Sequence, residues 1–267
     1  RPARNFDRFF LNELDREVWS QQIDTFLSRM TDAVIDEALL RQPREVRGFH
    51  SEKITNTLKE RRQHFKADMM KYYDFLTEEV NIVGTNQREL FVIDKLEGGK
   101  VHIKVNKIDT NGAIATRVYE RTFDENATRQ LMIYGLEGRD SFVVRGVASS
   151  IKMRIIGGPG DDHFRNESNE GKRIRVYDVS FEENKFEGNL SGFLQHVSGN
   201  PRNNEYSRIF YRYGYVKPGL TAAFNIDDGV FLGGRLEVLT HGFRKEPFSQ
   251  RHIFNVGHAL RTSSYFF

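Results

Sequence analysis

The chain has 267 residues, of which 38% are hydrophobic and 29% charged, and this composition excludes a disordered tail and a helical membrane protein. The chain has 40 Lys and Arg residues and 37 Asp and Glu residues, and the net charge of +3 is too small to indicate a nucleic-acid partner. Without cysteine, the chain forms no disulfide scaffold, cysteine-based zinc site or iron–sulfur cluster. No run of 18 apolar residues predicts a transmembrane helix.

Residues 1–84 predict a helical hairpin. Apolar residues recur at three- and four-residue spacing over residues 11–39, which predicts one long amphipathic helix that ends before Pro43. A second apolar stripe covers residues 51–80, and Ser51 is the expected N-cap of that helix. Two amphipathic helices with a short link need another surface to pack against.

Residues 85–187 predict a β-rich region with solenoid-like repeats. Similar strand-like segments recur 22 and then 21 residues apart, at residues 132–135, 154–157 and 175–178. In the Gly/Asp turns that follow the first two segments, Phe142 and Phe164 occupy equivalent positions. One strand and one turn per unit is typical of a short β-solenoid, in which both Phe side chains point inward. Two similar hairpins in an ordinary sheet are the alternative.

Residues 188–267 predict long antiparallel strands, because polar and apolar residues alternate over 216–226, 230–240 and 253–262. Each run approaches the roughly 9–11 residues of a transmembrane β-strand, whereas strands of soluble proteins average about 5–6. A further strand over residues 205–213 is the candidate for a fourth. A membrane barrel needs about eight strands to close. The sequence therefore predicts either a fragment with an incomplete barrel or a soluble sheet.

Together these zones predict an α+β fold that is mainly β. It combines an N-terminal helical hairpin, a central β-sheet or short β-solenoid, and C-terminal long antiparallel strands of an incomplete β-barrel.

The glycine-rich turns contain the candidate metal ligands. Residues 157–165 match the calcium-binding nonapeptide G-G-x-G-x-D-x-U-x at every fixed position, and residues 135–143 match it at all but one. Glycines let carbonyl groups converge and aspartates supply hard anionic oxygens, so Asp140, Asp161 and Asp162 are the expected calcium ligands. The motifs stand 22 residues apart rather than nine, and tight corners without metal are the alternative. No other cofactor is expected.

No catalytic motif is present. The sequence lacks a G-x-S-x-G nucleophile elbow, a G-x-x-x-x-G-K-[ST] phosphate loop and an H-E-x-x-H zinc pair. We therefore expect neither catalytic nor cofactor-binding residues, and we expect this segment not to be an enzyme.

Three segments of the chain resemble large outer-membrane proteins of Bacteroidota-type bacteria that end in a surface-antigen barrel of the BamA/TamA kind. They are residues 6–12, residues 131–140 leading to 155–162, and residues 225–229 leading to 240–248. The resemblance implies a non-catalytic periplasmic region before the barrel together with the first barrel strands.

It also implies a Gram-negative outer-membrane location with a periplasmic portion, and a role in outer-membrane protein assembly or transport. Outer-membrane lipid and other envelope proteins would be the partners. Some relatives carry an upstream calcineurin-like metallophosphoesterase module, and any enzymatic activity would reside there. A soluble, secreted β-rich module that binds a glycan or a protein is the alternative function.

Overall fold

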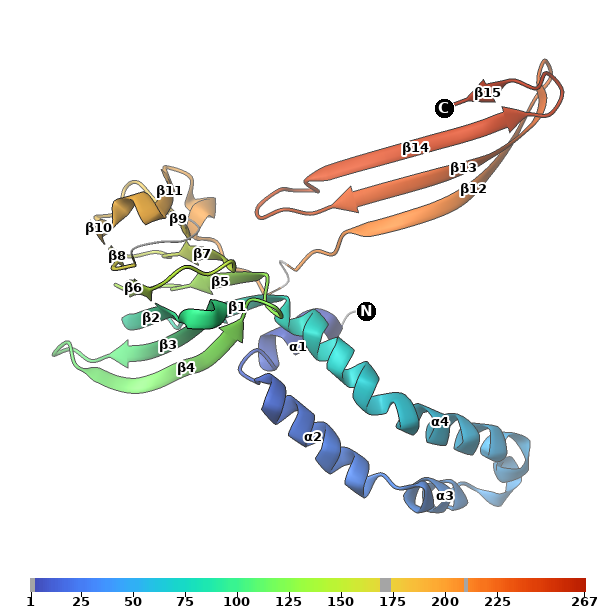
Figure 1. The fold of residues 1–267 in the computed structure, drawn as a ribbon, viewed down its shortest axis with the longest axis horizontal. Coiled ribbons are helices and arrows are strands. Elements are labelled where there is room, and N and C mark those ends of the chain that lie inside the picture. Colours follow the sequence, from blue (N-terminus) through green and yellow to red (C-terminus); the bar gives the residue numbers. More distant parts are fainter. Residues whose placement is uncertain (1–2, 169–173, 209–210) are drawn as a thin grey trace. The chain divides into compact units, whose positions relative to one another are not determined.

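The computed structural model describes residues 3–168, 174–208 and 211–267, and it shows an α+β fold that is mainly β (Figure 1). The chain divides into two compact units, Arg1–Ser207 and Arg208–Phe267. The described part of the first unit contains the helices and two sheets, and the second unit contains one antiparallel sheet.

The helices of the first unit are α1 (Ala3–Phe10), α2 (Arg16–Arg29), α3 (Asp32–Leu40) and α4 (Arg44–Thr77). The prediction of one helix over residues 11–39 is wrong, because the chain breaks between α2 and α3. Thr31 is the N-cap of α3, and its side-chain oxygen accepts a hydrogen bond from the Val34 N–H at 3.3 Å. None of the described helices has the length and apolar character needed to cross a membrane.

The bounds of α4 also differ from the expectation. The helix begins directly after Pro43, which occupies the N-cap, and not at Ser51, whose hydroxyl donates to the Gln42 side chain at 3.1 Å. It ends at Thr77 because the apolar residues from Val80 onward pair as a strand with residues 130–134. Tertiary strand pairing therefore overrides the helical periodicity at this end.

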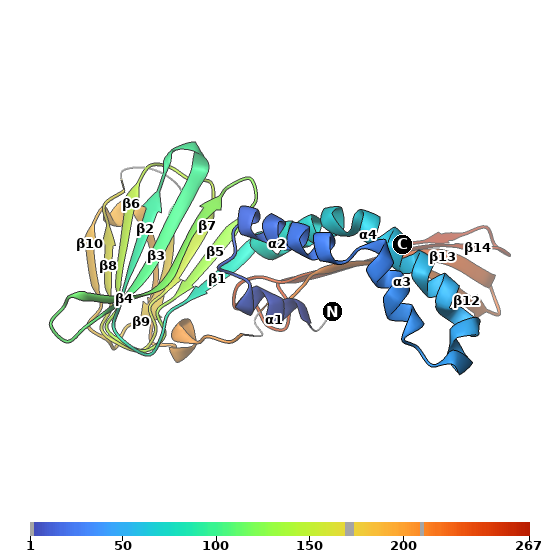
Figure 2. The same ribbon diagram turned by 90° about the horizontal axis from the view of Figure 1, so that it is seen from below.

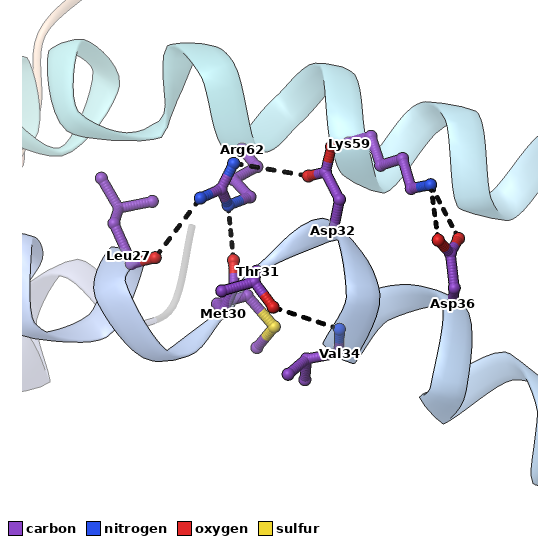
Figure 3. Close-up of polar contacts among 8 residues, drawn as sticks. All are labelled: Leu27, Met30, Thr31, Asp32, Val34, Asp36, Lys59 and Arg62. Atoms are coloured by element: carbon purple, nitrogen blue, oxygen red, sulfur yellow. Dashed lines mark hydrogen bonds and ion pairs between the residues drawn. The ribbon is translucent and has the colours of Figure 1, made fainter.

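Arg62 of α4 connects the two helices on either side of the break (Figure 3). Its guanidinium group donates to the carbonyl oxygens of Met30 and Leu27, the latter at 3.5 Å, and pairs with Asp32 at 3.3 Å. Nearby, Lys59 pairs with Asp36 of α3 at 2.7 Å. One side chain thus satisfies carbonyls at the end of α2 and a carboxylate at the start of α3.

We predict that Arg62→Ala destabilises the helical region by about 1–2 kcal/mol, because the carbonyls at the break lose a charged donor. The fluorescence of Trp19, the only tryptophan, reports this directly during urea unfolding, since Trp19 is buried in the helical core with Tyr73. Arg41→Ala is the matched control, because Arg41 forms an exposed pair with Glu37 and should change stability by less than about 0.5 kcal/mol. Equal effects of the two substitutions would contradict the assigned role.

The predicted β-solenoid is present in the first unit (Figures 1 and 2). One sheet has the all-parallel order β1-β5-β7-β9-β11, and the other has the order β10-β8-β6-β2-β3-β4, in which β2, β3 and β4 pair antiparallel. The strands of the first are β1 (Glu79–Val83), β5 (Gln130–Tyr134), β7 (Lys152–Ile156), β9 (Ile174–Val179) and β11 (Phe193–Ser198). Those of the second are β2 (Glu89–Lys95), β3 (Lys100–Ile108), β4 (Ile114–Asp124), β6 (Ser141–Gly146), β8 (His163–Asn166) and β10 (Lys185–Gly188).

The register confirms the repeats found in the sequence. Met132 pairs with Arg154, and Arg154 pairs with Arg175, so equivalent residues lie directly above one another. Inside the solenoid, four Phe rings form a stack in which neighbouring ring centroids are 4.6, 5.1 and 4.9 Å apart, made by Phe91, Phe142, Phe164 and Phe186. Phe142 and Phe164 are fully buried, as the inward orientation predicted from the repeats requires.

The solenoid extends beyond residues 85–187 at both ends, because β1 precedes this range and β11 follows it. After β11, the short helix η3 (Pro201–Asn204) and the residues up to Ser207 stay in the first unit. The Asn203 side chain donates to the Asp178 carbonyl at 2.9 Å, and the Tyr206 ring lies 4.8 Å from that of Tyr134. These contacts hold the residues up to Ser207 in the first compact unit, and the second compact unit begins at Arg208.

The second unit is a four-stranded antiparallel sheet with the order β12-β13-β14-β15. Its strands are β12 (Tyr215–Asn225), β13 (Gly229–Thr240), β14 (Gln250–Ala259) and β15 (Tyr265–Phe266). The three long alternating runs are therefore strands, as predicted. The expected strand over 205–213 is not formed by its described residues, and residues 209 and 210 lie outside them.

Candidate functional site

A column of buried acidic side chains runs along one corner of the solenoid. Glu89, Asp140 and Asp162 occupy the same position in successive coils, at or immediately before the start of strands that pair in register, and the half-buried Asn184 takes this position in the next coil. The Asp140 carboxylate accepts a hydrogen bond from the Glu89 N–H at 2.8 Å, and Asp162 accepts one from the Asp140 N–H at 2.8 Å. The side-chain oxygen of Asn184 continues the series by accepting from the Asp162 N–H at 2.8 Å.

Glycines at the ends of the facing strands make room for these carboxyl groups. A Cβ atom on Gly135 would lie 2.4 Å from Asp140 Oδ2, and one on Gly157 would lie 2.3 Å from Asp162 Oδ2. In the next coil Asp178 replaces the glycine, and its Oδ2 also lies 2.3 Å from the same point beside Gly157. The carboxyl oxygens of Asp162 and Asp178 are thus close neighbours in a space that only glycine leaves open.

These carboxyl groups are neutralised by burial. Asp140, Asp162 and Asp178 are at most 2% exposed, and Oδ2 of each is buried without a hydrogen-bond partner. Desolvation raises the pKa of Asp140 to about 8, that of Asp162 to about 9 and that of Asp178 to about 7. It also raises the pKa of Glu89, against the hydrogen bonds from Thr85 that lower it. At neutral pH, Asp140 and Asp162 are therefore carboxylic acids.

The structure brings together two of the three expected calcium ligands. Asp140 and Asp162 share the column, whereas Asp161 faces the other way, pairing with Arg139 at 3.3 Å and accepting from the Glu183 N–H at 3.0 Å. Over the described ranges, no three or more acidic or histidine side chains are arranged to hold a metal ion.

Sequence reasoning missed Glu89 and Asn184 in the column, and it missed Asp178 beside the column. A signal for Glu89 was present, because an acidic residue stands five positions after Gly84, as Asp140 does after Gly135. Asp178 stands at the position that Gly135 and Gly157 occupy in the preceding coils, so the spacing from a glycine could not identify it.

We predict that the protein loses stability as pH rises. The folded-state pKa values of about 7–9 lie above the ordinary value of about 4, so the folded chain holds more protons than the unfolded chain across this window. The free energy of unfolding should fall by more than about 2 kcal/mol between pH 5 and pH 9. Chemical denaturation followed by the circular dichroism of the strands measures it.

Asp162→Asn should flatten this pH dependence and stabilise the protein at pH 8, because the amide keeps the acceptor oxygen and, unlike the carboxylate of the unfolded chain, takes up no proton on folding. Asn184 already fills the equivalent position in the next coil. Asp161→Asn, on the outer side of the turn, is the matched control and should leave the profile unchanged. If calcium raised wild-type stability at pH 8 and Asp162→Asn abolished that gain, the column would be an ionised calcium site instead.

A second candidate site is the sheet of the second unit, whose two faces differ in chemistry. The register places one set of alternate residues of β12, β13 and β14 on one face. That face carries no Asp, Glu, Lys or Arg, and its polar residues are Thr240, Gln250 and two histidines. It consists of Val216, Pro218, Leu220, Ala222, Phe224, Val230, Leu232, Gly234, Leu236, Val238, Thr240, Gln250, His252, Phe254, Val256 and His258. This face is largely exposed to solvent, and the exposed fraction is 95% for Leu220 and 72% for Phe224.

The opposite face carries the charges of these strands. Glu237 lies in the middle strand, β13, near its C-terminal end, and is only 7% exposed. Its carboxylate accepts from the Tyr215 hydroxyl at 2.8 Å, from Arg251 at 2.9 Å and from Arg235 at 3.4 Å. Lys217 pairs with Glu237 across the strands and shares this face. One side of the sheet is therefore uncharged and mainly apolar, and the other side is mixed, with all the charged residues of these strands beside apolar residues such as Phe231 and Ile253.

Comparison of the chain with known protein families, with curated proteins and with solved structures finds no match.

Proposed function

We propose that this chain is a non-catalytic part of an outer-membrane β-barrel protein, in which the sheet of the second unit contacts lipid and the helices and solenoid form a periplasmic region. The protein would act in outer-membrane protein assembly or transport. The observation that carries the proposal is the exposed apolar face shared by β12, β13 and β14. Alternating apolar and polar positions on long antiparallel strands are the pattern of lipid-facing barrel strands.

The size of the apolar face supports contact with a bilayer. The nine residues from Val216 to Phe224 extend over roughly 26–30 Å at about 3.3 Å per residue. The lipid-facing band of outer-membrane barrels is about 25 Å tall. The three long strands have 11, 12 and 10 residues, so each is long enough to cross that band.

The distribution of charge supports the same assignment. An Arg or Lys on the lipid face of a barrel costs about 2–4 kcal/mol at the bilayer midplane, whereas the inner face tolerates charge. Every Lys, Arg, Asp and Glu within β12, β13 and β14 lies on the face of Glu237. A soluble sheet of this kind would instead need a protein layer over Leu220 and its neighbours.

The sheet edges add a requirement. Among the described residues, β12 has no neighbouring strand on its outer edge, and β15 pairs only with Gly257 and His258 of β14, so most of the outer edge of β14 also has none. Lipid does not solvate unpaired backbone groups at such edges. In the proposed barrel these edges pair with further strands.

We predict that Leu220→Arg and Leu236→Arg reduce outer-membrane integration of the polypeptide as the native cell makes it, because each places a charge on the lipid face. Thr221→Arg is the matched control, since Thr221 neighbours Leu220 but belongs to the opposite face. Membrane fractionation and the heat-dependent gel shift of a folded barrel measure integration.

If wild-type protein is found in the soluble fraction without a heat-dependent shift, the membrane proposal fails. A soluble binding module for a glycan or a protein would then be the working function, and Leu220→Arg should leave its location unchanged.

A further inference from the structure

The positive charges of the second unit gather in one half of its sheet. We divide the sheet between Gly219 and Leu220, and the half that contains the start of β12, the end of β13 and the start of β14 is called the entry half, because the chain enters β12 there (Figure 1). Residues 211–219 and 235–255 make up the entry half and hold six Lys and Arg residues and two Glu residues. The far half, residues 220–234 and 256–267, holds one Arg and two Asp residues. The entry half therefore has a net charge of +4, and the far half has a net charge of −1.

Both carboxylates of the entry half are paired within it. Glu246 pairs with Arg212 at 2.7 Å. Glu237 pairs with Arg251 at 2.9 Å and with Arg235 at 3.4 Å. The negative charges of this half are thus engaged by three of its cations, and the charges of the other three add to the positive excess.

Two of the other three cations are adjacent in the loop between β13 and β14, residues 241–249. Lys245 is exposed, and among the described residues it forms no ion pair. The cationic carbon of Arg244 lies 4.9 Å from the centre of the Phe243 ring, and a guanidinium group keeps its charge in any surroundings. Lys217, near the start of β12, is the third and is also exposed. The loop therefore presents two neighbouring positive charges at the end of the sheet.

The uncharged face of the sheet becomes polar in the same half. Its polar residues Thr240, Gln250 and His252 all lie in the entry half, where Thr240 pairs with Gln250. Phe248 of the loop is 37% exposed, and aromatic residues are typical of the two water interfaces of an outer-membrane barrel. For a sheet in lipid, this end therefore has the composition of a membrane–water boundary, with the loop cations at the level of the headgroups.

We propose that the entry end of the sheet binds the phosphate groups of anionic phospholipids, with Arg244 and Lys245 as the ligands; this inference rests on the proposed membrane function. Positively charged residues at a membrane surface attract anionic lipids by about 1 kcal/mol each, and long Lys and Arg side chains reach the headgroups while their stems stay near apolar surface. The remaining cations of the entry half raise the positive potential at the same place. An acidic protein would match the charge but not the lipid-facing surface that continues from this end.

The test uses the polypeptide as the native cell makes it, purified from the outer membrane and reconstituted in phosphatidylcholine vesicles. A trace of spin-labelled phosphatidylglycerol or spin-labelled phosphatidylcholine is added, and electron paramagnetic resonance measures the fraction of each label that the protein immobilises. At low salt, phosphatidylglycerol should associate about fivefold more strongly than phosphatidylcholine, and this preference should disappear at about 1 M NaCl.

The double variant Arg244→Gln, Lys245→Gln should lose at least about half of the preference, since it removes both loop charges. Arg261→Gln is the control, because it removes a positive charge from the far half and glutamine keeps an N–H donor for the Ile226 carbonyl, which Arg261 contacts at 2.8 Å. It should leave the preference unchanged.

The outcomes separate this inference from the proposed function. Protein that inserts into the vesicles and keeps its heat-dependent gel shift, but immobilises both labels equally, overturns headgroup binding and leaves the membrane proposal standing. A preference that persists in the double variant also overturns it, because the anionic lipid would then bind elsewhere. Protein that inserts into no bilayer overturns both.

Discussion

The parallel, in-register stacking of 22-residue coils is the constraint on which the first unit depends. Because each residue lies directly above its equivalent in the next coil, side chains of one kind form continuous columns. Aromatic rings gain from this arrangement, as the stack from Phe91 to Phe186 illustrates. Stacking does not stabilise ionised carboxyl groups, since like charges repel in a dry interior. Protonation removes that repulsion at the corner occupied by Asp140 and Asp162.

The same stacking explains what sequence reasoning could reach. The repeats at residues 132, 154 and 175 predicted the register correctly, because every coil imposes the same spacing on the chain. The candidate ligands were only partly grouped. Asp161 and Asp162 are adjacent in sequence, and in this extended turn their side chains point to opposite sides. Sequence proximity could not show which of them joins Asp140.

The helical region was less predictable because its ends depend on tertiary contacts. Apolar periodicity runs through the break at Met30 and Thr31. Thr31 caps α3 locally, and Arg62 of a distant helix adds the contacts that join the two sides of the break. The apolar periodicity likewise continues to Val80, but Val80 lies in β1 and its backbone pairs with β5. In both places a contacting partner lies 30 or more residues away in the sequence, and apolar periodicity alone does not identify it.

The two units place their polar and apolar groups in opposite ways, and this difference bears on function. The solenoid encloses its Phe stack and even hides carboxylic acids, whereas the C-terminal sheet exposes an uncharged apolar face and shields Glu237 with Tyr215, Arg235 and Arg251. A single aqueous environment does not favour both arrangements. An apolar environment around the sheet and an aqueous one around the solenoid would favour each arrangement in its own place. If the proposed function holds, the passage from one environment to the other would fall at residues 207 and 208, where the chain divides into its two units.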